Sequence, residues 1–303
     1  MEAEPAAIFD SGHSASNIPI ELDASSKVYL RGKINNSLEV RILLDTGAAT
    51  MFAIDRQHAE SLNLTLNEGY QVQGPGASRS AAALAKDISV RLPGITLVHI
   101  DAVAVSFYLP QENEERYAIL GFEFFKNFVI EIDYDNRLAN IYDSQAYGAE
   151  IFPERESRRP EAELQTIPVT TIDNLPYVTA RVAFPGSEPI EAQFHLDSGS
   201  SIAVQFYFGF VTEQRLMEQL TNAWPGSAVG EGGEIRTAFA LAESIELGPL
   251  KLWSQTVGLE AEQGGSLAST IAVGSIGAQI VHTTKTTFDV PHNRIFVAKS
   301  VGT

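Results

Sequence analysis

Short stretches in which apolar and polar residues roughly alternate recur along the whole chain. Residues 28–34 and 177–184 are two examples, and a period of two is typical of β-strands that bury one face. Helical periodicity is scarce. It is best in residues 55–64, where Asp55 can serve as the N-cap, and in residues 211–222. The pattern therefore predicts a mostly β protein.

The predicted elements occur twice in the same order. One strand runs into Asp45-Thr-Gly, and another runs into Asp197-Ser-Gly. In each copy a Gly-rich turn, a pair of strands, an apolar segment ending in glycine and a final hairpin follow. The corresponding segments are 74–76 and 230–233, 84–97 and 241–252, 118–121 and 271–274, and 128–138 and 287–296. An ordered series of this kind predicts an internal duplication.

The spacing within the two copies supports a division into two lobes. Gly121 follows Asp45 by 76 positions, and Gly274 follows Asp197 by 77. The segment between the copies is highly charged and flanked by prolines, a composition typical of linkers. The predicted parts are a disordered or loosely attached tail at 1–17, an N-terminal lobe at 18–152, a linker at 153–165 and a C-terminal lobe at 166–303.

Composition and charge narrow the class of protein. A hydrophobic fraction of 44% with 19% charged residues is typical of folded globular proteins. No apolar run approaches the roughly 18 residues of a membrane-spanning helix. The formal net charge of −17 argues against nucleic acid as a partner, because phosphate binding requires clustered Lys and Arg. The histidines show no spacing typical of metal ligands, so we expect neither a metal nor a cofactor.

The sequence leaves the cellular compartment open. Residues 1–7 contain neither the basic nor the apolar region of a signal peptide. Cysteine is absent, which excludes disulfides but is compatible with any compartment. A leader removed before Met1 would favour the periplasm or secretion, and the cytoplasm stays open as the alternative.

The paired Asp-Thr/Ser-Gly motif suits acid–base chemistry. A carboxyl group at the end of a buried strand, followed by a tight glycine turn, is held rigidly. The Thr or Ser hydroxyl can bond to neighbouring backbone and fix the turn. Two such carboxyl groups that meet across an interface cannot both ionise easily, so they share a proton. One can then take a proton from water while the other donates to a substrate carbonyl.

The chain resembles the pepsin and retropepsin superfamily of aspartic proteases over nearly its whole length, and duplicated retropepsin-like proteins of bacteria above all. The resemblance rests on the two hydrophobic-hydrophobic-Asp-Thr/Ser-Gly turns and on the segments that end in Gly121 and Gly274. It implies a bilobal acid-protease fold, with two homologous β-barrel-like lobes and the active site at their interface. It implies a dyad of Asp45 and Asp197, tying hydroxyls on Thr46 and Ser198, and turn glycines at Gly47 and Gly199.

The two Gly-rich turns are candidate flaps that would close over an extended peptide bound as an added strand. The alternative is that they are ordinary hairpin turns. The chain has no clear equivalent of the pepsin flap tyrosine near the first turn. The candidate substrate-binding residues are Gly74, Pro75, Gly76, Gly230, Gly232 and Gly233.

Other readings of the same residues are weaker. Asp10-Ser-Gly repeats the tripeptide without a β-rich strand before it or a supporting glycine, so we expect no role for it. A Ser-His-Asp triad of Ser198, His195 and Asp197 is disfavoured, because neighbours in one strand and turn rarely reach the required geometry. His195 aligns with Leu43, so we expect it to be an ordinary strand position.

The sequence thus predicts a monomeric aspartic endopeptidase that hydrolyses extended segments of proteins or peptides with one activated water. A catalytically silent peptide-binding or scaffold protein with the same fold is the alternative, because a fold by itself does not establish activity. Both aspartates and both following hydroxyls are present, which favours the enzyme.

Overall fold

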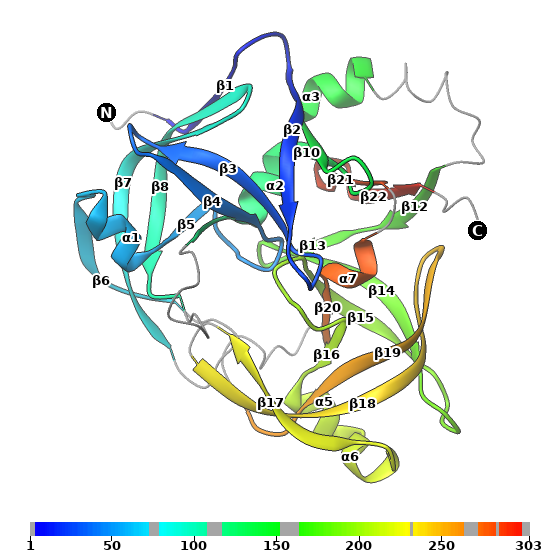
Figure 1. Cartoon of the computed structure of the whole chain (residues 1–303). Helices are drawn as coiled ribbons and strands as arrows, with labels where there is room; N and C mark the ends of the chain where they lie inside the picture. Colours follow the sequence, from blue (N-terminus) through cyan, green and yellow to red (C-terminus); the bar gives the residue numbers. More distant parts are fainter. Residues whose placement is uncertain are drawn as a thin grey trace.

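The structure is a computed structural model (Figure 1). It describes residues 4–72, 79–107, 117–151, 164–230, 233–263, 272–282 and 285–298.

The N-terminal half consists mainly of strands, with short helices at their ends. Its strands are β1 (Ala6–Phe9), β2 (Ser14–Leu22), β3 (Val28–Ile34), β4 (Glu39–Leu44), β5 (Phe52–Asp55), β6 (Leu66–Val72), β7 (Ser80–Leu92), β8 (Ile95–Val105), β9 (Tyr117–Leu120), β10 (Phe128–Asp133) and β11 (Leu138–Asp143). Its helices are α1 (Arg56–Ser61), α2 (Phe122–Asn127), α3 (Ser144–Ala146) and the π-helical turn η1 (Tyr147–Ile151).

The C-terminal half is built in the same way. Its strands are β12 (Leu164–Pro168), β13 (Thr170–Ile172), β14 (Leu175–Ala183), β15 (Ile190–Asp197), β16 (Val204–Phe206), β17 (Trp224–Gly230), β18 (Gly233–Leu247), β19 (Leu250–Glu260), β20 (Gly274–Gly277), β21 (Lys285–Asp289) and β22 (Arg294–Ala298). Its helices are α5 (Phe208–Glu213), α6 (Leu216–Gln219), α7 (Ala278–Val281) and the 3-10 turn η2 (Val290–His292).

The two halves share one unusual strand order. In the first half β4 pairs parallel with β9, β9 antiparallel with β5, and β5 parallel with β8. In the second half β15 pairs parallel with β20, β20 antiparallel with β16, and β16 parallel with β19. Both orders then continue through a long hairpin, β7–β8 or β18–β19, to an outer strand. The predicted mostly β, bilobal architecture is confirmed, and Figure 1 shows the two lobes.

A sheet joins the two lobes. Its order is β12-β22-β21-β10-β11-β2, and the junction is the antiparallel pairing of β10 with β21. The final hairpin of each copy therefore lies in this sheet. The predicted linker at 153–165 lies outside the described residues except for its end, where Leu164 and Gln165 begin β12.

The N-terminal segment differs from the predicted tail. From residue 6 onward it forms β1 and β2 rather than a loose end. Strand β5 covers residues 102–105 of β8, and β1 pairs with residues 95–98, so it satisfies backbone groups that β5 leaves open. The N–H of Asp10 donates to the carbonyl of Gly94 at 3.0 Å, so the Asp-Ser-Gly segment that follows β1 is a turn of the N-terminal lobe.

The helix predicted at 55–64 is present with its expected N-cap, but it ends earlier, at Ser61. Helix α1 begins after Asp55, whose carboxylate accepts from the N–H of His58 at 3.1 Å. The predicted helix at 211–222 is wrong in its bounds. Two short helices, α5 and α6, occupy residues 208–219 instead, because Arg215 between them adopts a left-handed backbone with φ of 51°.

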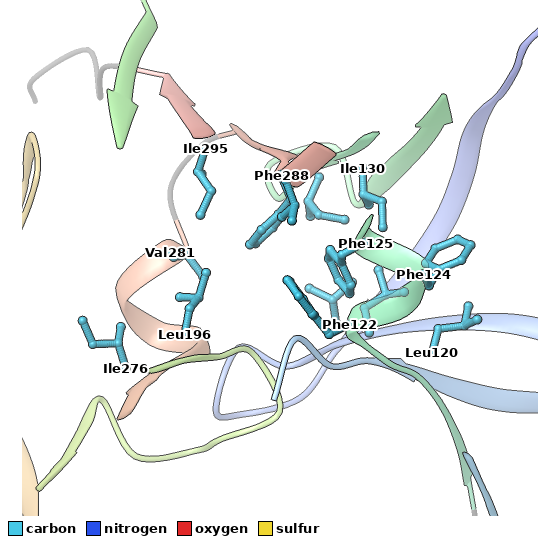
Figure 2. Close-up of a cluster of buried hydrophobic side chains, with 14 of the residues drawn as sticks. Leu120, Phe122, Phe124, Phe125, Ile130, Leu196, Ile276, Val281, Phe288 and Ile295 are labelled. Carbon is cyan, nitrogen blue, oxygen red and sulfur yellow. The ribbon is translucent and has the colours of Figure 1, made fainter. Parts of the chain in front are cut away.

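The hydrophobic core runs behind the strand ends of both lobes (Figure 2). Phe122, Phe124 and Phe125 of α2 are buried in this core, and the rings of Phe125 and Phe288 of β21 meet edge to face at 5.4 Å. The cluster includes Leu196 and Ile276 of the C-terminal lobe. Because side chains from both halves form one core, the two strand ends at the interface are held in a fixed relation.

Candidate active site

The two Asp-Thr/Ser-Gly turns meet at the interface of the lobes. The N–H of Thr46 donates to the hydroxyl of Ser198 at 3.0 Å, and the Thr46 hydroxyl donates to the carbonyl of Leu196 at 2.8 Å. The converse bonds run from the N–H of Ser198 to the Thr46 hydroxyl and from the Ser198 hydroxyl to the carbonyl of Leu44, both at 3.0 Å. Four reciprocal bonds therefore tie the turns together, as the resemblance implied for Thr46 and Ser198.

Asp45 and Asp197 face each other across this pair of turns. The N–H of Gly47 donates to Oδ1 of Asp45 at 2.7 Å, and the N–H of Gly199 donates to Oδ1 of Asp197 at 3.0 Å. Each carboxyl group also lies against the glycine of the opposite turn, so closely that an added Cβ would overlap with it. The structure thus brings together Asp45, Asp197 and the turn glycines, and Gly47 and Gly199 leave the space that the carboxyl groups occupy.

The environment raises the pKa of both carboxyl groups. Burial is the largest cause for Asp45, and the neighbouring Asp197 adds to it, so the pKa of Asp45 rises to about 7. Burial also raises the pKa of Asp197, although the N–H groups of Gly199 and Ser200 act in the opposite direction. Both residues keep part of their surface exposed. A pair that holds one proton and can be reached from solvent can serve as a base and an acid together.

The supporting glycine of the second turn is Gly277 rather than the expected Gly274. Leu44 pairs with Leu120, and Leu196 pairs with Ile276, so the residues that follow are Gly121 and Gly277. A Cβ on Gly121 would overlap with the carbonyls of Ala48 and Thr50, and one on Gly277 with those of Ser200 and Ile202. Sequence spacing misplaced the second glycine by three residues, because Gly274, like Gly121, directly follows three apolar residues.

The predicted flaps are described only in part. Gly74, Pro75, Gly76 and Gly232 lie outside the described residues. Gly230 and Gly233 face each other as the last pair of the β17–β18 hairpin. Gly233 has a φ of 100°, a conformation that favours glycine. Whether this hairpin closes over a substrate stays a prediction.

His195 is a regular position of β15, as expected, and it lies near Asp45 of the other lobe. It is 9% exposed, and its ring lies 5.7 Å from that of Tyr177. Burial lowers the pKa of His195 to about 4, and Asp45 and the backbone of Thr46 act in the opposite direction. Its position two residues before Asp197 was the available signal, because alternate residues of a strand share a face.

Other chemistry is limited in the part of the chain that the structure describes. It contains no group of three or more His, Cys, Asp or Glu placed to hold a metal ion. Among the same residues, no helix is long and apolar enough to span a membrane.

Comparison with known proteins agrees with this geometry. Residues 30–124, which include Asp45 and Gly121, match the family described as aspartyl protease. The predicted resemblance to aspartic proteases is thereby confirmed for this part of the N-terminal lobe. The matched region spans the strands from β3 to β9 together with α1 and the start of α2.

Solved structures similar to the chain cover both lobes. Conglutin gamma, a basic 7S globulin from lupine seeds, has a TM-score of 0.49 at 11% identity over 96% of each chain. Basic 7S globulin from soybean has a TM-score of 0.47 at 12% identity over 95% of each chain. The protein edgp has a TM-score of 0.46 at 9% identity over 94% of each chain. No curated protein matches the sequence significantly.

Removing either tying hydroxyl is expected to destabilise the chain. Thr46→Val and Ser198→Ala each delete one donor and one acceptor in a buried network, so the N–H of the opposite turn loses its partner. Each should lower the free energy of unfolding by about 1–3 kcal/mol. Urea unfolding of the two variants measures this. A value for either variant equal to that of the parent would show that the four bonds do not hold the turns together.

Proposed function

We propose that this protein is an aspartic endopeptidase that cleaves peptide bonds with a water activated by Asp45 and Asp197. One observation supports the proposal above all others. Two carboxyl groups from equivalent strand ends face each other with raised pKa values, each fixed by the glycine N–H of its own turn.

The proposed reaction follows from the shared proton. The ionised member of the pair takes a proton from a water held between the carboxyl groups, and the water oxygen attacks the peptide carbonyl. The protonated member donates to the carbonyl oxygen, which relieves the developing negative charge. Collapse of the tetrahedral intermediate breaks the carbon–nitrogen bond, and the leaving amine takes a proton from the pair. We assign the proton to the pair rather than to either aspartate, because their titrations are linked.

The substrate class that fits this reaction is an extended segment of a protein or peptide. The hairpins β6–β7 and β17–β18 project from the two lobes on either side of the interface (Figure 1). An extended chain could pair with strand edges there through its backbone. A folded substrate would not present its peptide bonds to two carboxyl groups enclosed by the turns, so we expect cleavage of unfolded segments.

The proposal is tested by incubating the protein with an unfolded protein and with peptides of mixed sequence, from acidic to neutral pH. We expect internal cleavage, and we expect a pepstatin-type transition-state mimic to block it by binding both carboxyl groups. Binding of extended peptides without cleavage would instead support a silent peptide-binding protein. Failure both to cleave and to bind the inhibitor at every pH would contradict the proposal.

Activity is expected to fall as the pH rises through about 7. The pKa of Asp45 is raised to about 7, so above that pH the pair loses its shared proton and with it the acid of the reaction. The pH dependence of kcat/KM reports this titration in the free enzyme. A profile that keeps rising into the alkaline range would show that protonation of the pair is not required.

A further inference from the structure

The faces of the two lobes that adjoin the carboxyl groups can be compared residue by residue. In the N-terminal lobe, Leu43 pairs with Ile119, and Ile119 pairs with Ala53. Ala53 pairs with Val103, and Val105, two residues further on β8, pairs with Ala82. We call Leu43, Ala53, Ala82, Val105 and Ile119 the apolar set. Four of them belong to a small cluster separate from the main core, and Val72, the last residue of β6, joins it.

The same positions of the C-terminal lobe are polar. His195 pairs with Ser275, and Ser275 pairs with Gln205. Gln205 pairs with Gly258, and Glu260, two residues further on β19, pairs with Thr237. We call these residues of the C-terminal lobe the polar set. In the order of the apolar positions Leu43, Ile119, Ala53, Val105 and Ala82, its members are His195, Ser275, Gln205, Glu260 and Thr237. All members of the polar set are buried, with exposures from 0% to 9%.

Burying five polar side chains where the other lobe has five apolar ones is costly unless they gain partners. Several atoms of the polar set gain none among the described residues. These are Nε2 of His195, the amide oxygen of Gln205 and Oε1 of Glu260. Such a concentration of unpartnered atoms on one side of one lobe points to a ligand that supplies the missing hydrogen bonds.

One oxygen of the Glu260 carboxylate, Oε2, has a structural role as a helix cap. It accepts from the N–H of Phe208 at 2.9 Å, at the start of α5. In the N-terminal lobe, Asp55 serves the corresponding helix, where it accepts from the N–H of His58. A carboxylate on β19 is therefore one way to cap α5. Capping leaves Oε1 of Glu260 unused and does not explain why His195 and Gln205 are polar.

The polar set lies between the catalytic pair and the base of a hairpin. His195 is close enough to Asp45 for that carboxylate to influence its pKa. Tyr207 is influenced by the charges of both Asp197 and Glu260, and its hydroxyl bonds with Ser275. Thr237 belongs to β18, whose hairpin with β17 is the candidate flap. A side chain of a bound peptide that entered beside the carboxyl groups would meet this set first at His195.

The charge balance of the polar set favours a cation. Burial raises the pKa of Glu260 to about 8, with the N–H of Phe208 and the nearby amide of Gln205 acting in the opposite direction. A positive group placed at Oε1 would remove the cost of ionising this carboxyl group. The carbonyl oxygen of Gln205 is a second unpartnered acceptor. An ammonium or guanidinium group has donors for both, whereas an apolar side chain has none.

We propose that the polar set forms a subsite of the C-terminal lobe that takes a basic side chain, lysine or arginine, next to the peptide bond to be cleaved. The inference rests on the proposed peptidase function and adds its substrate class. The apolar set forms the opposite wall and takes an apolar side chain on the other side of that bond. The two lobes therefore select different substrate side chains on the two sides of the cleaved bond, although their folds are equivalent.

The test is digestion of a mixed-sequence peptide library, with the cleaved bonds identified by mass spectrometry. Wild-type protein should enrich Lys and Arg at one position beside the cleaved bond. Glu260→Gln should lower that enrichment relative to Leu and Met by about tenfold or more. The Gln side chain keeps an acceptor for the N–H of Phe208, so the cap of α5 is retained, and equal thermal unfolding midpoints verify it.

Two further variants make the result specific. Glu243→Gln removes the same charge from an exposed position of β18 and should leave the preference for basic residues unchanged. The double variant His195→Leu with Glu260→Val installs the residues of the apolar set and should shift the preference to apolar side chains. A wild-type profile without basic enrichment, or enrichment that persists in Glu260→Gln, would overturn the proposal.

A binding measurement separates this inference from the proposed function. Asp45→Asn protein should bind an extended fluorescent peptide containing Lys about tenfold or more tightly than the same peptide with norleucine. This readout does not require turnover. If wild-type protein cleaves nothing but this difference is present, the peptidase function fails and the basic subsite stands. Equal affinities would contradict the subsite whether or not the protein cleaves.

Discussion

Replacing Asp45 or Asp197 with asparagine should lower kcat/KM by roughly a thousandfold while the protein stays folded. Either change leaves a single ionisable carboxyl group, so one residue can no longer supply the base and the other the acid, and positioned acid–base groups contribute about 10²–10⁴ in rate. The asparagine oxygen can still accept from the N–H of Gly47 or Gly199, which holds each carboxyl group now. Initial rates on one peptide substrate, with circular dichroism of each variant, measure both halves of the expectation.

A matched control for these variants is Asp10→Asn. It makes the same substitution in the remaining Asp-Thr/Ser-Gly tripeptide of the chain, which follows β1 on the surface of the N-terminal lobe. This variant should keep wild-type activity. Equal loss in all three variants would indicate a general effect of charge removal, and full activity of Asp45→Asn would refute the dyad.

The Asp45→Asn substitution should also change how the free energy of unfolding depends on pH. The folded-state pKa of Asp45 is raised from 3.8 to about 7, so its proton stabilises the fold fully below about pH 4. That contribution is lost as the pH rises towards 7. An asparagine cannot ionise, so the Asp45→Asn variant should lose less stability than the wild type between these two values.

Much of the fold could be predicted from the sequence because the chain repeats itself. The strands that end in Asp45 and Asp197 and the final hairpins were expected, and each occurs in both lobes. Repetition helps because two weak local signals at matched positions support each other. It could not reveal the sheet in which β10 pairs with β21, since that pairing joins the copies rather than repeating within them.

At the candidate site, too, features set by residues close in sequence could be predicted, whereas features set by strand pairing could not. The two turns and their hydroxyls follow from a three-residue motif that bonds to its own backbone and to its copy. The placement of Gln205 and Glu260 on the same side of the lobe as His195 could not be predicted, because it depends on the register of five strands that are distant in sequence. Likewise, spacing alone could not decide between Gly274 and Gly277, since only the pairing of Leu196 with Ile276 fixes which glycine follows.

Gly277→Ala and Gly121→Ala are expected to be the most destabilising small substitutions near the site. At both positions the backbone passes directly behind a catalytic turn. The N–H of Gly277 donates to the carbonyl of Ala203 at 3.0 Å, and that of Gly121 to the carbonyl of Met51 at 3.1 Å. A methyl group on either glycine would overlap with carbonyl oxygens of the turn. Backbone atoms cannot turn aside as a flexible side chain can, so the strands must separate.

We therefore expect each substitution to lower the free energy of unfolding by about 3 kcal/mol or more and to reduce activity by displacing Asp197 or Asp45. Gly209→Ala is the control, because Gly209 lies in α5 with open space around its Cβ position and alanine favours a helix over glycine. Urea unfolding should show that this control is at least as stable as the parent. If Gly277→Ala and Gly121→Ala unfold like Gly209→Ala, close packing behind the turns does not position the carboxyl groups. In that case the four bonds of Thr46 and Ser198 would have to do so alone.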